Sequence, residues 1–255
     1  MDSRPSAGVS ATDVDQEARE SEPVTGPPTK KDEREDTLRG VSPHCGIRFR
    51  VFQYAVRAFL FPLFRYRRRG WRRIPDGGPV LLVSNHASHL DPVMVGAATE
   101  RRLFYLARST LFRPRLFAWF IRSFGAVPIE REGHGLGGVK TTLALLREGC
   151  AVVVFPEGTR TRDGSIGPLR GGFVNVAKRT AVSVVPVWVD GTFEVLPRGR
   201  RFPRPRKIEV RVGAPFRVPV DLEVERALEH VKEQWEALAE GRPVPRPGGQ
   251  IPSGA

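Results

Sequence analysis

Cysteine is scarce in this 255-residue sequence, which contains only Cys45 and Cys150. Two cysteines provide neither a disulfide framework nor the ligand set of a zinc site, and they favour a reducing, cytosolic environment. Long apolar runs are also missing, because none reaches the roughly 18 to 20 residues of a membrane-spanning helix. The first forty residues are polar, so we expect no secretory signal. A Gly-x-Ser-x-Gly elbow is absent as well, which argues against a serine hydrolase.

Acidic residues are few outside the N-terminal part. The net charge is +13 and the isoelectric point is about 10.8. Residues 1–40 carry ten acids and six bases, whereas residues 41–255 carry 18 acids and 35 bases. A basic body suits nucleic acid, an anionic membrane surface or a phosphorylated substrate. Because no helix-turn-helix, zinc-finger or RNA-binding signature accompanies this charge, we expect no nucleic-acid partner.

Composition divides the chain into four parts. Residues 1–42 are rich in Pro, Ser, Thr, Asp and Glu, which predicts a disordered acidic tail. Residues 43–73 join a short apolar and aromatic stretch to an arginine cluster, a combination typical of a basic amphipathic segment that docks on a membrane. A core helix followed by a solvated basic loop is the alternative. Residues 74–240 are predicted to form the main domain, and residues 241–255 a Pro- and Gly-rich tail.

From residue 79 onward, apolar strand-like runs alternate with helical patterns. Strands are predicted at 79–84, 103–107, 126–129, 151–155, 183–189 and 207–212. Helices are predicted at 92–99, 114–123, 136–148, 171–180 and 221–240, the last with Asp221 as its N-cap. This alternation predicts an α/β fold, with a mixed, largely parallel sheet flanked by helices.

A polar turn over residues 85–91 follows the first of these strands. Asp91 suits the N-cap of the next helix, because Pro92 suits its first position. His86 and Asp91 can meet across such a turn, and a carboxylate on one ring nitrogen makes the other a general base. A capping aspartate beside a surface histidine is the alternative. A metal site of His86, His89 and Asp91 is permitted by the spacing but disfavoured, since the other motif loops add no His or Cys.

Residues 155–161 follow the strand-like run 151–154. Gly158 lets the backbone turn tightly, and the Thr159 hydroxyl and Arg160 guanidinium are phosphate donors. Ligands of α/β folds usually bind at strand ends. A plain turn with solvated charges is the alternative. The glycine-rich stretch 164–172 lacks the Lys-Ser/Thr ending of a P-loop, and we interpret it as a flexible rim of the site.

Four motifs occur in a fixed order along the chain. They are Asn-His-x-Ser-x-x-Asp at 85–91, Gly-x-x-x-Ile-x-Arg at 125–131, Phe-Pro-Glu-Gly-Thr-Arg at 155–160 and Val-Pro-Val at 185–187. Together they resemble the glycerolipid acyltransferases, specifically the 1-acyl-glycerol-3-phosphate acyltransferases, over residues 70–215. The third motif is followed by Leu-Arg-Gly at 169–171 where relatives often have Phe-Lys before the glycine, which bears on acceptor preference.

The resemblance implies acyl transfer from acyl-CoA or acyl-carrier protein to the free hydroxyl of 1-acyl-glycerol-3-phosphate, giving phosphatidic acid. His86 would be the general base and Asp91 would orient it, supported by Asn85 and Ser88. Backbone amides near His86 would stabilise the oxyanion. The implied acceptor-binding residues are Arg131, Glu157, Gly158, Thr159 and Arg160. No metal and no cofactor beyond the thioester co-substrate is implied.

The implied partners are an anionic membrane surface, a lysophospholipid acceptor and an acyl thioester donor. We therefore expect a peripheral or monotopic enzyme at the cytoplasmic face of the cell membrane. Two alternatives stay open at this point. One is an acyltransferase of the same family that acts on another lyso-lipid or a glycolipid, and the other is a non-catalytic basic protein that binds membranes or nucleic acid.

Overall fold

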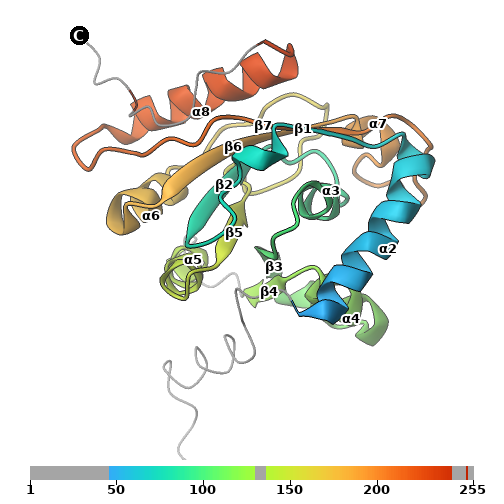
Figure 1. Ribbon diagram of the computed structural model, residues 1–255. Helices are drawn as coiled ribbons and strands as arrows, with labels where there is room; N and C mark the ends of the chain where they lie inside the picture. Colours follow the sequence, from blue (N-terminus) through green and yellow to red (C-terminus); the bar gives the residue numbers. More distant parts are fainter. Residues whose placement is uncertain (1–45, 130–135, 243–250, 252–255) are drawn as a thin grey trace, which may run out of the picture. The chain divides into compact units, whose positions relative to one another are not determined.

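The computed structural model describes residues 46–129, 136–242 and 251. Its described elements are strands and helices in alternation (Figure 1). The strands are β1 Arg67–Arg69, β2 Val80–Ser84, β3 Leu103–Arg108, β4 Ala126–Ile129, β5 Ala151–Val154, β6 Ser183–Asp190 and β7 Glu209–Val212. The helices are α2 Ile47–Phe64, α3 Asp91–Ala98, α4 Arg115–Ser123, α5 Leu136–Arg147, α6 Gly172–Thr180, α7 Thr192–Val195 and α8 Val224–Ala239, with 3-10 turns η1 Trp71–Arg73 and η2 Ser109–Phe112.

The strands form one seven-stranded sheet in the order β1-β7-β6-β2-β5-β3-β4. Neighbouring strands run parallel except for β6 and β7, which are antiparallel. The predicted mixed, largely parallel sheet flanked by helices is therefore confirmed. Each predicted strand and helix between residues 79 and 240 is present within two or three residues of its predicted bounds.

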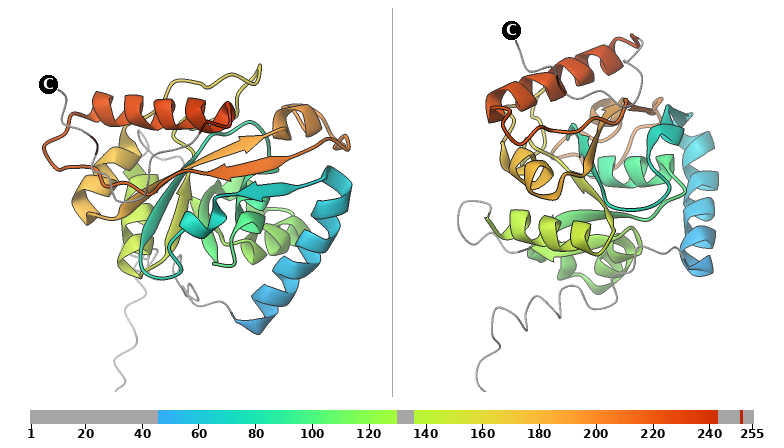
Figure 2. Two further views of the ribbon diagram at one scale, coloured as in Figure 1. Left: turned by 45° about the horizontal axis from the view of Figure 1, so that its top comes forward. Right: turned by 60° about the vertical axis from the view of Figure 1, so that its left-hand side comes forward.

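The sheet has a hydrophobic core on each face. Along β2, Val80 and Leu82 face the core shared with α2 and α3, whereas Leu81 and Val83 face the core shared with α5, α6 and α8. Alternate residues of a strand point to opposite faces, so a continuous apolar run such as β2 predicts a strand buried on both sides. Figures 1 and 2 show α5, α6 and α8 on one side of the sheet and α2 and α3 on the other.

The arginine cluster after α2 belongs to the predicted docking segment 43–73. Its residues 67–69 form β1, which pairs with β7 at the sheet edge, and not the solvated loop of the alternative interpretation. Arg57 and Arg68 donate hydrogen bonds to carbonyls at the C-terminal end of α3, and both pair with Glu100. Positive charge lies favourably at a helix C-terminus, which explains why these arginines turn inward. Part of the expected docking segment is thus built into the domain.

Smaller differences concern helix ends and short elements. Asp91 is the first residue of α3 rather than its N-cap, because its side chain faces the preceding turn and makes no capping bond to the helix. The N-cap of α8 is Glu223 instead of Asp221. The short α7 was not predicted, since four residues are too few for a periodic pattern. Within the described ranges, no helix is both long and apolar enough to cross a membrane.

Candidate active site

The turn between β2 and α3 brings His86 and Asp91 together. The His86 Nδ1 atom lies 2.9 Å from Asp91 Oδ2, at hydrogen-bond distance. The Asp91 side chain is fully buried, whereas the His86 side chain is 19 % exposed. The predicted contact across the turn is therefore present, and the imidazole is reachable by a small molecule.

The Asp91 carboxylate also fixes the turn and the state of the ring. Its Oδ2 atom accepts the backbone N–H groups of Ala87 and Ser88, at 2.7 and 2.8 Å. A carboxylate oxygen has no proton to donate, so the ring is the donor of this hydrogen bond and His86 carries its proton on Nδ1. The other ring nitrogen, Nε2, is then an unprotonated acceptor. This is the tautomer that a general base requires.

The two expected supporting residues anchor the turn to neighbouring elements. The Asn85 side chain donates to the carbonyl of Val189 on β6 and accepts the N–H of the same residue. The Ser88 hydroxyl donates to the carbonyl of Leu196, just after α7. These contacts join residues more than a hundred positions apart and restrict where the His86 ring can lie.

Glu157 holds the β5 loop against the histidine turn. Its Oε1 accepts the backbone N–H of His86 at 2.7 Å, and its Oε2 accepts the N–H of Gly167 at 3.0 Å. Burial raises the pKa of this carboxyl above its usual value, and the two backbone hydrogen bonds oppose the rise. Because each oxygen accepts a backbone N–H group, Glu157 joins the β5 loop to the histidine turn, and its contact with the acceptor stays a prediction. The backbone N–H of Thr161 adds a bond to the His86 carbonyl.

Phe155 is a site residue that the sequence reasoning did not single out. Its ring stacks on the His86 imidazole, with centroids 4.2 Å apart and planes 25° apart. The residue opens the Phe-Pro-Glu-Gly-Thr-Arg motif, so the signal was present in the sequence. A phenyl ring on one face of the imidazole leaves the ring edge as the route to Nε2.

A cluster of arginines lies near the His–Asp pair. Burial lowers the pKa of Arg160, and the positive charges of Arg198 and Arg108 lower it further. Arg108 ends β3 and Arg198 follows α7, so three separate segments bring these cations together. Neither Arg108 nor Arg198 was predicted as a site residue. Arg108 stands alone at the end of its strand, and Arg198 opens a basic stretch, 198–207, that is typical of a solvated or membrane-facing loop.

The structure describes two of the three remaining residues that were predicted to bind the acceptor. Gly158 adopts the left-handed conformation, with φ of 67°, as a tight turn requires. Thr159 is exposed beside it. Arg131 lies outside the described residues. The N–H groups of residues 86–88 bind carboxylates of the protein, so the predicted oxyanion donors would have to come from other backbone amides near the turn. Among the described residues, no group of three or more His, Cys, Asp or Glu side chains is placed to hold a metal.

The fold and the site define an α/β domain with a His–Asp pair at the end of a central strand. A family model described as Acyltransferase matches residues 65–190. The chain is 32 % identical over 199 residues to an N-acylphosphatidylethanolamine synthase of Arabidopsis thaliana, covering 69 % of this chain and 70 % of that protein. The chain therefore belongs to the Acyltransferase family.

Other relatives carry one common name. A chloroplastic 1-acyl-sn-glycerol-3-phosphate acyltransferase of Arabidopsis thaliana is 30 % identical over 143 residues, which cover 55 % of this chain and 40 % of that protein. The 1-acyl-sn-glycerol-3-phosphate acyltransferase of Bacillus subtilis is 27 % identical over 144 residues, covering 56 % and 69 %. The crystal structure of the LPA acyltransferase PlsC from Thermotoga maritima matches with a TM-score of 0.63 and 25 % identity, over 76 % of this chain and 78 % of that chain.

Proposed function

We propose that this protein is a 1-acyl-glycerol-3-phosphate acyltransferase. It would transfer a fatty acyl group from acyl-CoA or acyl-carrier protein to the free hydroxyl of the acceptor, giving phosphatidic acid. The single observation that carries the proposal is the hydrogen bond between the reachable His86 ring and the buried Asp91 carboxylate. The names of the relatives supply the substrate class.

The reaction needs one base and no covalent enzyme intermediate. Nε2 of His86 takes the proton from the acceptor hydroxyl as the oxygen attacks the thioester carbonyl carbon. The tetrahedral intermediate then expels the thiolate, which takes the proton back from His86. Asp91 stabilises the transient imidazolium and keeps Nε2 aimed outward. Because the thioester is already activated, we propose that no metal or other cofactor takes part.

The arginines around the site would hold the acceptor phosphate. Arg160 is half-buried, and the cations of Arg108 and Arg198 lie near enough to lower its pKa. Binding of a phosphate dianion would be favourable at such a site, because the anion relieves the repulsion among the guanidinium groups. Arg131 follows β4, whose neighbour β3 ends in Arg108, and we propose that it joins this group.

The N-terminal helix would bring the enzyme to its lipid substrate. The side of α2 that faces the protein contains the buried polar residues Gln53 and Arg57. Its outward side is apolar, and the exposed large apolar residues there are Ile47, Val51, Tyr54, Phe59, Phe61 and Leu63. The inward side also contributes Leu60 and Phe64 to the core, so apolar residues occur on both sides of α2. An outward side rich in large apolar residues suits a helix that lies in a membrane interface. We propose peripheral or monotopic attachment to the cytoplasmic face of an anionic membrane.

A second candidate acceptor has an observation in its favour. The N-acylphosphatidylethanolamine synthase covers 69 % of this chain, whereas the acyltransferases of Arabidopsis thaliana and Bacillus subtilis named above cover 55 % and 56 %. A neutral amine is deprotonated as it attacks, so the same His–Asp pair serves transfer to the headgroup nitrogen of an aminolipid. The acceptor panel of the test therefore includes phosphatidylethanolamine and a glycolipid.

An in vitro acyl-transfer assay tests the proposal. Purified protein is given acyl-CoA or acyl-carrier protein together with lysophosphatidate, other lyso-lipids, phosphatidylethanolamine or a glycolipid, and the products are identified by mass. We expect phosphatidic acid as the main product, lost with His86→Ala and kept with His230→Ala, a control histidine on α8. Transfer to another acceptor in preference would contradict the substrate, and vesicle binding without any transfer would support a non-catalytic protein.

The domain assignment is tested with the same assay. We propose that residues 1–42 are a dispensable tail and that residues 74–240 contain the acyltransferase domain. Removal of residues 1–42 should leave turnover intact. A large loss of turnover on that truncation would overturn this view of the tail.

A further inference from the structure

The helix α4 exposes an unusual amount of apolar surface for its length. Leu116 is 80 % exposed and Trp119 is 60 % exposed, and Phe117 and Phe120 are exposed as well. We call these four residues the α4 patch. Burial of large apolar side chains is favourable by about 1.5–3 kcal/mol each, so four of them facing water on one nine-residue helix indicate a binding surface.

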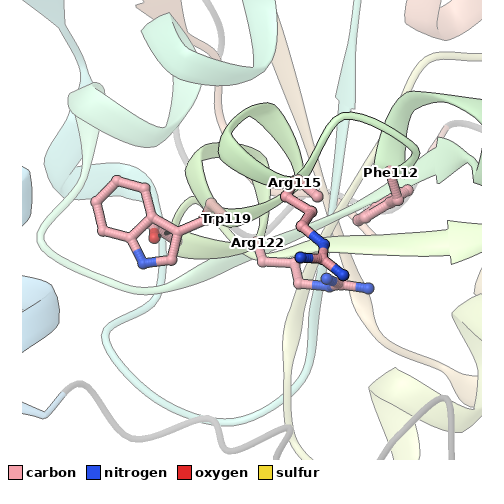
Figure 3. A pocket seen from close by; sticks show the side chains of 6 residues that line it. Phe112, Arg115, Trp119 and Arg122 are labelled. Atoms are coloured by element: carbon pink, nitrogen blue, oxygen red, sulfur yellow. Dashed lines mark hydrogen bonds between the residues drawn. The ribbon is translucent and has the colours of Figure 1, made fainter.

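A cleft beside the α4 patch is lined by two arginines. It has a volume of about 510 Å³, and its lining residues are Phe112, Arg115, Ala118, Trp119, Arg122 and Ser123. Arg115 and Arg122 lie seven positions apart, which is two helical turns, so both project from the same side of α4 (Figure 3). The Arg122 guanidinium lies over the Phe112 ring, 5.0 Å from its centroid. We call this the arginine cleft.

The charge of the arginine cleft is not balanced within the described part of the chain. Neither Arg115 nor Arg122 forms an ion pair with a described residue, although the two cations share one cleft. Exposed Arg113 adds a third positive charge just before the helix. A partner for this surface must therefore offer both negative charge and apolar surface, next to each other.

The α4 patch is continuous with the apolar side of α2. The Phe52 ring of α2 makes edge contacts with Trp119, Phe120 and Phe124, at centroid distances of 6.2, 6.4 and 5.1 Å. The two helices therefore present their exposed apolar residues from one packed aromatic cluster. A flat, extended partner can cover both, which a small peptide or a soluble ligand cannot do.

We propose that α4 is a second membrane-docking element, and that the arginine cleft binds the phosphate of an anionic phospholipid headgroup. The α4 patch would enter the acyl region while the two arginines hold the headgroup, with Trp119 at the boundary, where its amphipathic ring is favoured. This proposal rests on the proposed function only in requiring that the enzyme work at a bilayer. The arginine cleft is also connected to the active site through the chain, because η2 joins Arg108 of the active-site arginines to the cleft residue Phe112.

Vesicle co-sedimentation of the full chain separates the two parts of the proposal. The double variant Arg115→Gln/Arg122→Gln should weaken binding to vesicles that contain phosphatidylglycerol by about 30-fold, since each arginine near an anionic surface contributes about fivefold. Its binding to pure phosphatidylcholine vesicles should not change. Leu116→Ser should weaken binding to both kinds of vesicle by about tenfold, because it removes an apolar side chain from the acyl region.

Matched controls lie on the opposite side of the sheet. Arg147→Gln/Arg179→Gln removes two exposed arginines of α5 and α6 with the same change in net charge. Val220→Ser removes an exposed apolar residue before α8. Both controls should bind vesicles like the wild type. Equal losses for the α4 variants and their controls would overturn the proposal, because net charge alone would then explain binding.

Fluorescence and turnover provide independent readings. Phosphatidylcholine brominated on its acyl chains should quench the tryptophan fluorescence of the wild type, and should quench that of Trp119→Phe much less. Equal quenching of the two proteins would place Trp119 outside the bilayer and overturn the proposal. With a short-chain, water-soluble lysophosphatidate, the arginine variant should retain full turnover. No turnover by any form would refute the proposed function and leave the vesicle result standing, so the two failures are distinguishable.

Discussion

Replacing Asp91 with asparagine removes one negative charge while leaving the local geometry in place. The Oδ2 atom accepts three N–H groups, from His86, Ala87 and Ser88, whereas Oδ1 has no hydrogen-bond partner among the described residues. The asparagine oxygen will therefore take the Oδ2 position and the amide nitrogen the other. His86 keeps its proton on Nδ1, and the variant isolates the effect of the charge.

The size of the effect follows from the distance between the two charges. During the reaction His86 becomes a cation beside Asp91, with the nearest atoms 2.9 Å apart and the charge centres about 4 Å apart. At an effective dielectric constant of about 20 that attraction is about 4 kcal/mol. Some of it is recovered by the amide dipole, so we expect kcat to fall by about 100- to 1,000-fold with little change in KM. The buried, unpartnered amide should also cost about 1–3 kcal/mol of stability.

The assay follows release of the thiol from the acyl thioester, with thermal unfolding measured in parallel. His86→Ala and the double variant His86→Ala/Asp91→Asn complete the cycle. Because the carboxylate acts only through the imidazole, the double variant should be no slower than His86→Ala alone. A loss below about fivefold for Asp91→Asn, or a double variant whose loss is the product of the single losses, would refute a catalytic His–Asp pair.

Three further predictions concern stability and pH. Arg57→Ala should lower the free energy of unfolding by about 3 kcal/mol in denaturant titration, because it leaves buried α3 carbonyls without donors; an unchanged midpoint would contradict that role. Gly125→Ala should cost about 3 kcal/mol or more, since its added Cβ would overlap the Leu103 carbonyl, whereas Gly149→Ala, also at positive φ but with open space, should cost only about 1 kcal/mol. The pKa of Glu157 is raised in the folded state. Its contribution to the free energy of unfolding is therefore fully present below the unfolded-state pKa and is lost as the pH rises through the folded-state pKa. The wild type should therefore lose stability relative to Glu157→Gln as pH rises from about 4, and a difference independent of pH would contradict this.

The fold also changes how the membrane role of the N-terminal part should be tested. Deletion of residues 46–73 would appear to be a direct test, but it removes β1 from the sheet and the Arg57 contacts with α3. Loss of vesicle binding after such a deletion would then reflect an altered domain. Point substitutions on the outward side of α2, such as Val51→Ser and Phe59→Ser, change the exposed apolar surface and leave the inward contacts in place.

The sequence by itself determined the central strands of the sheet and the contact between His86 and Asp91. Runs such as residues 80–83 are apolar at every position, as expected of a strand buried on both faces. His86 and Asp91 are close in sequence, so a single turn decides their contact. For that reason their hydrogen bond could be predicted without knowledge of the rest of the fold.

The tertiary structure decided everything that depends on contacts between distant segments. Glu157 and His86 are 71 positions apart, and only the pairing of β5 with β2 gives the glutamate its partner amide. The arginine run at 67–69 has no strand propensity of its own and became β1 because β7 offered a free edge. Local pattern fixes elements whose stabilising contacts are within the segment, whereas an edge strand or a buried carboxylate takes its stability from the groups that the fold brings to it.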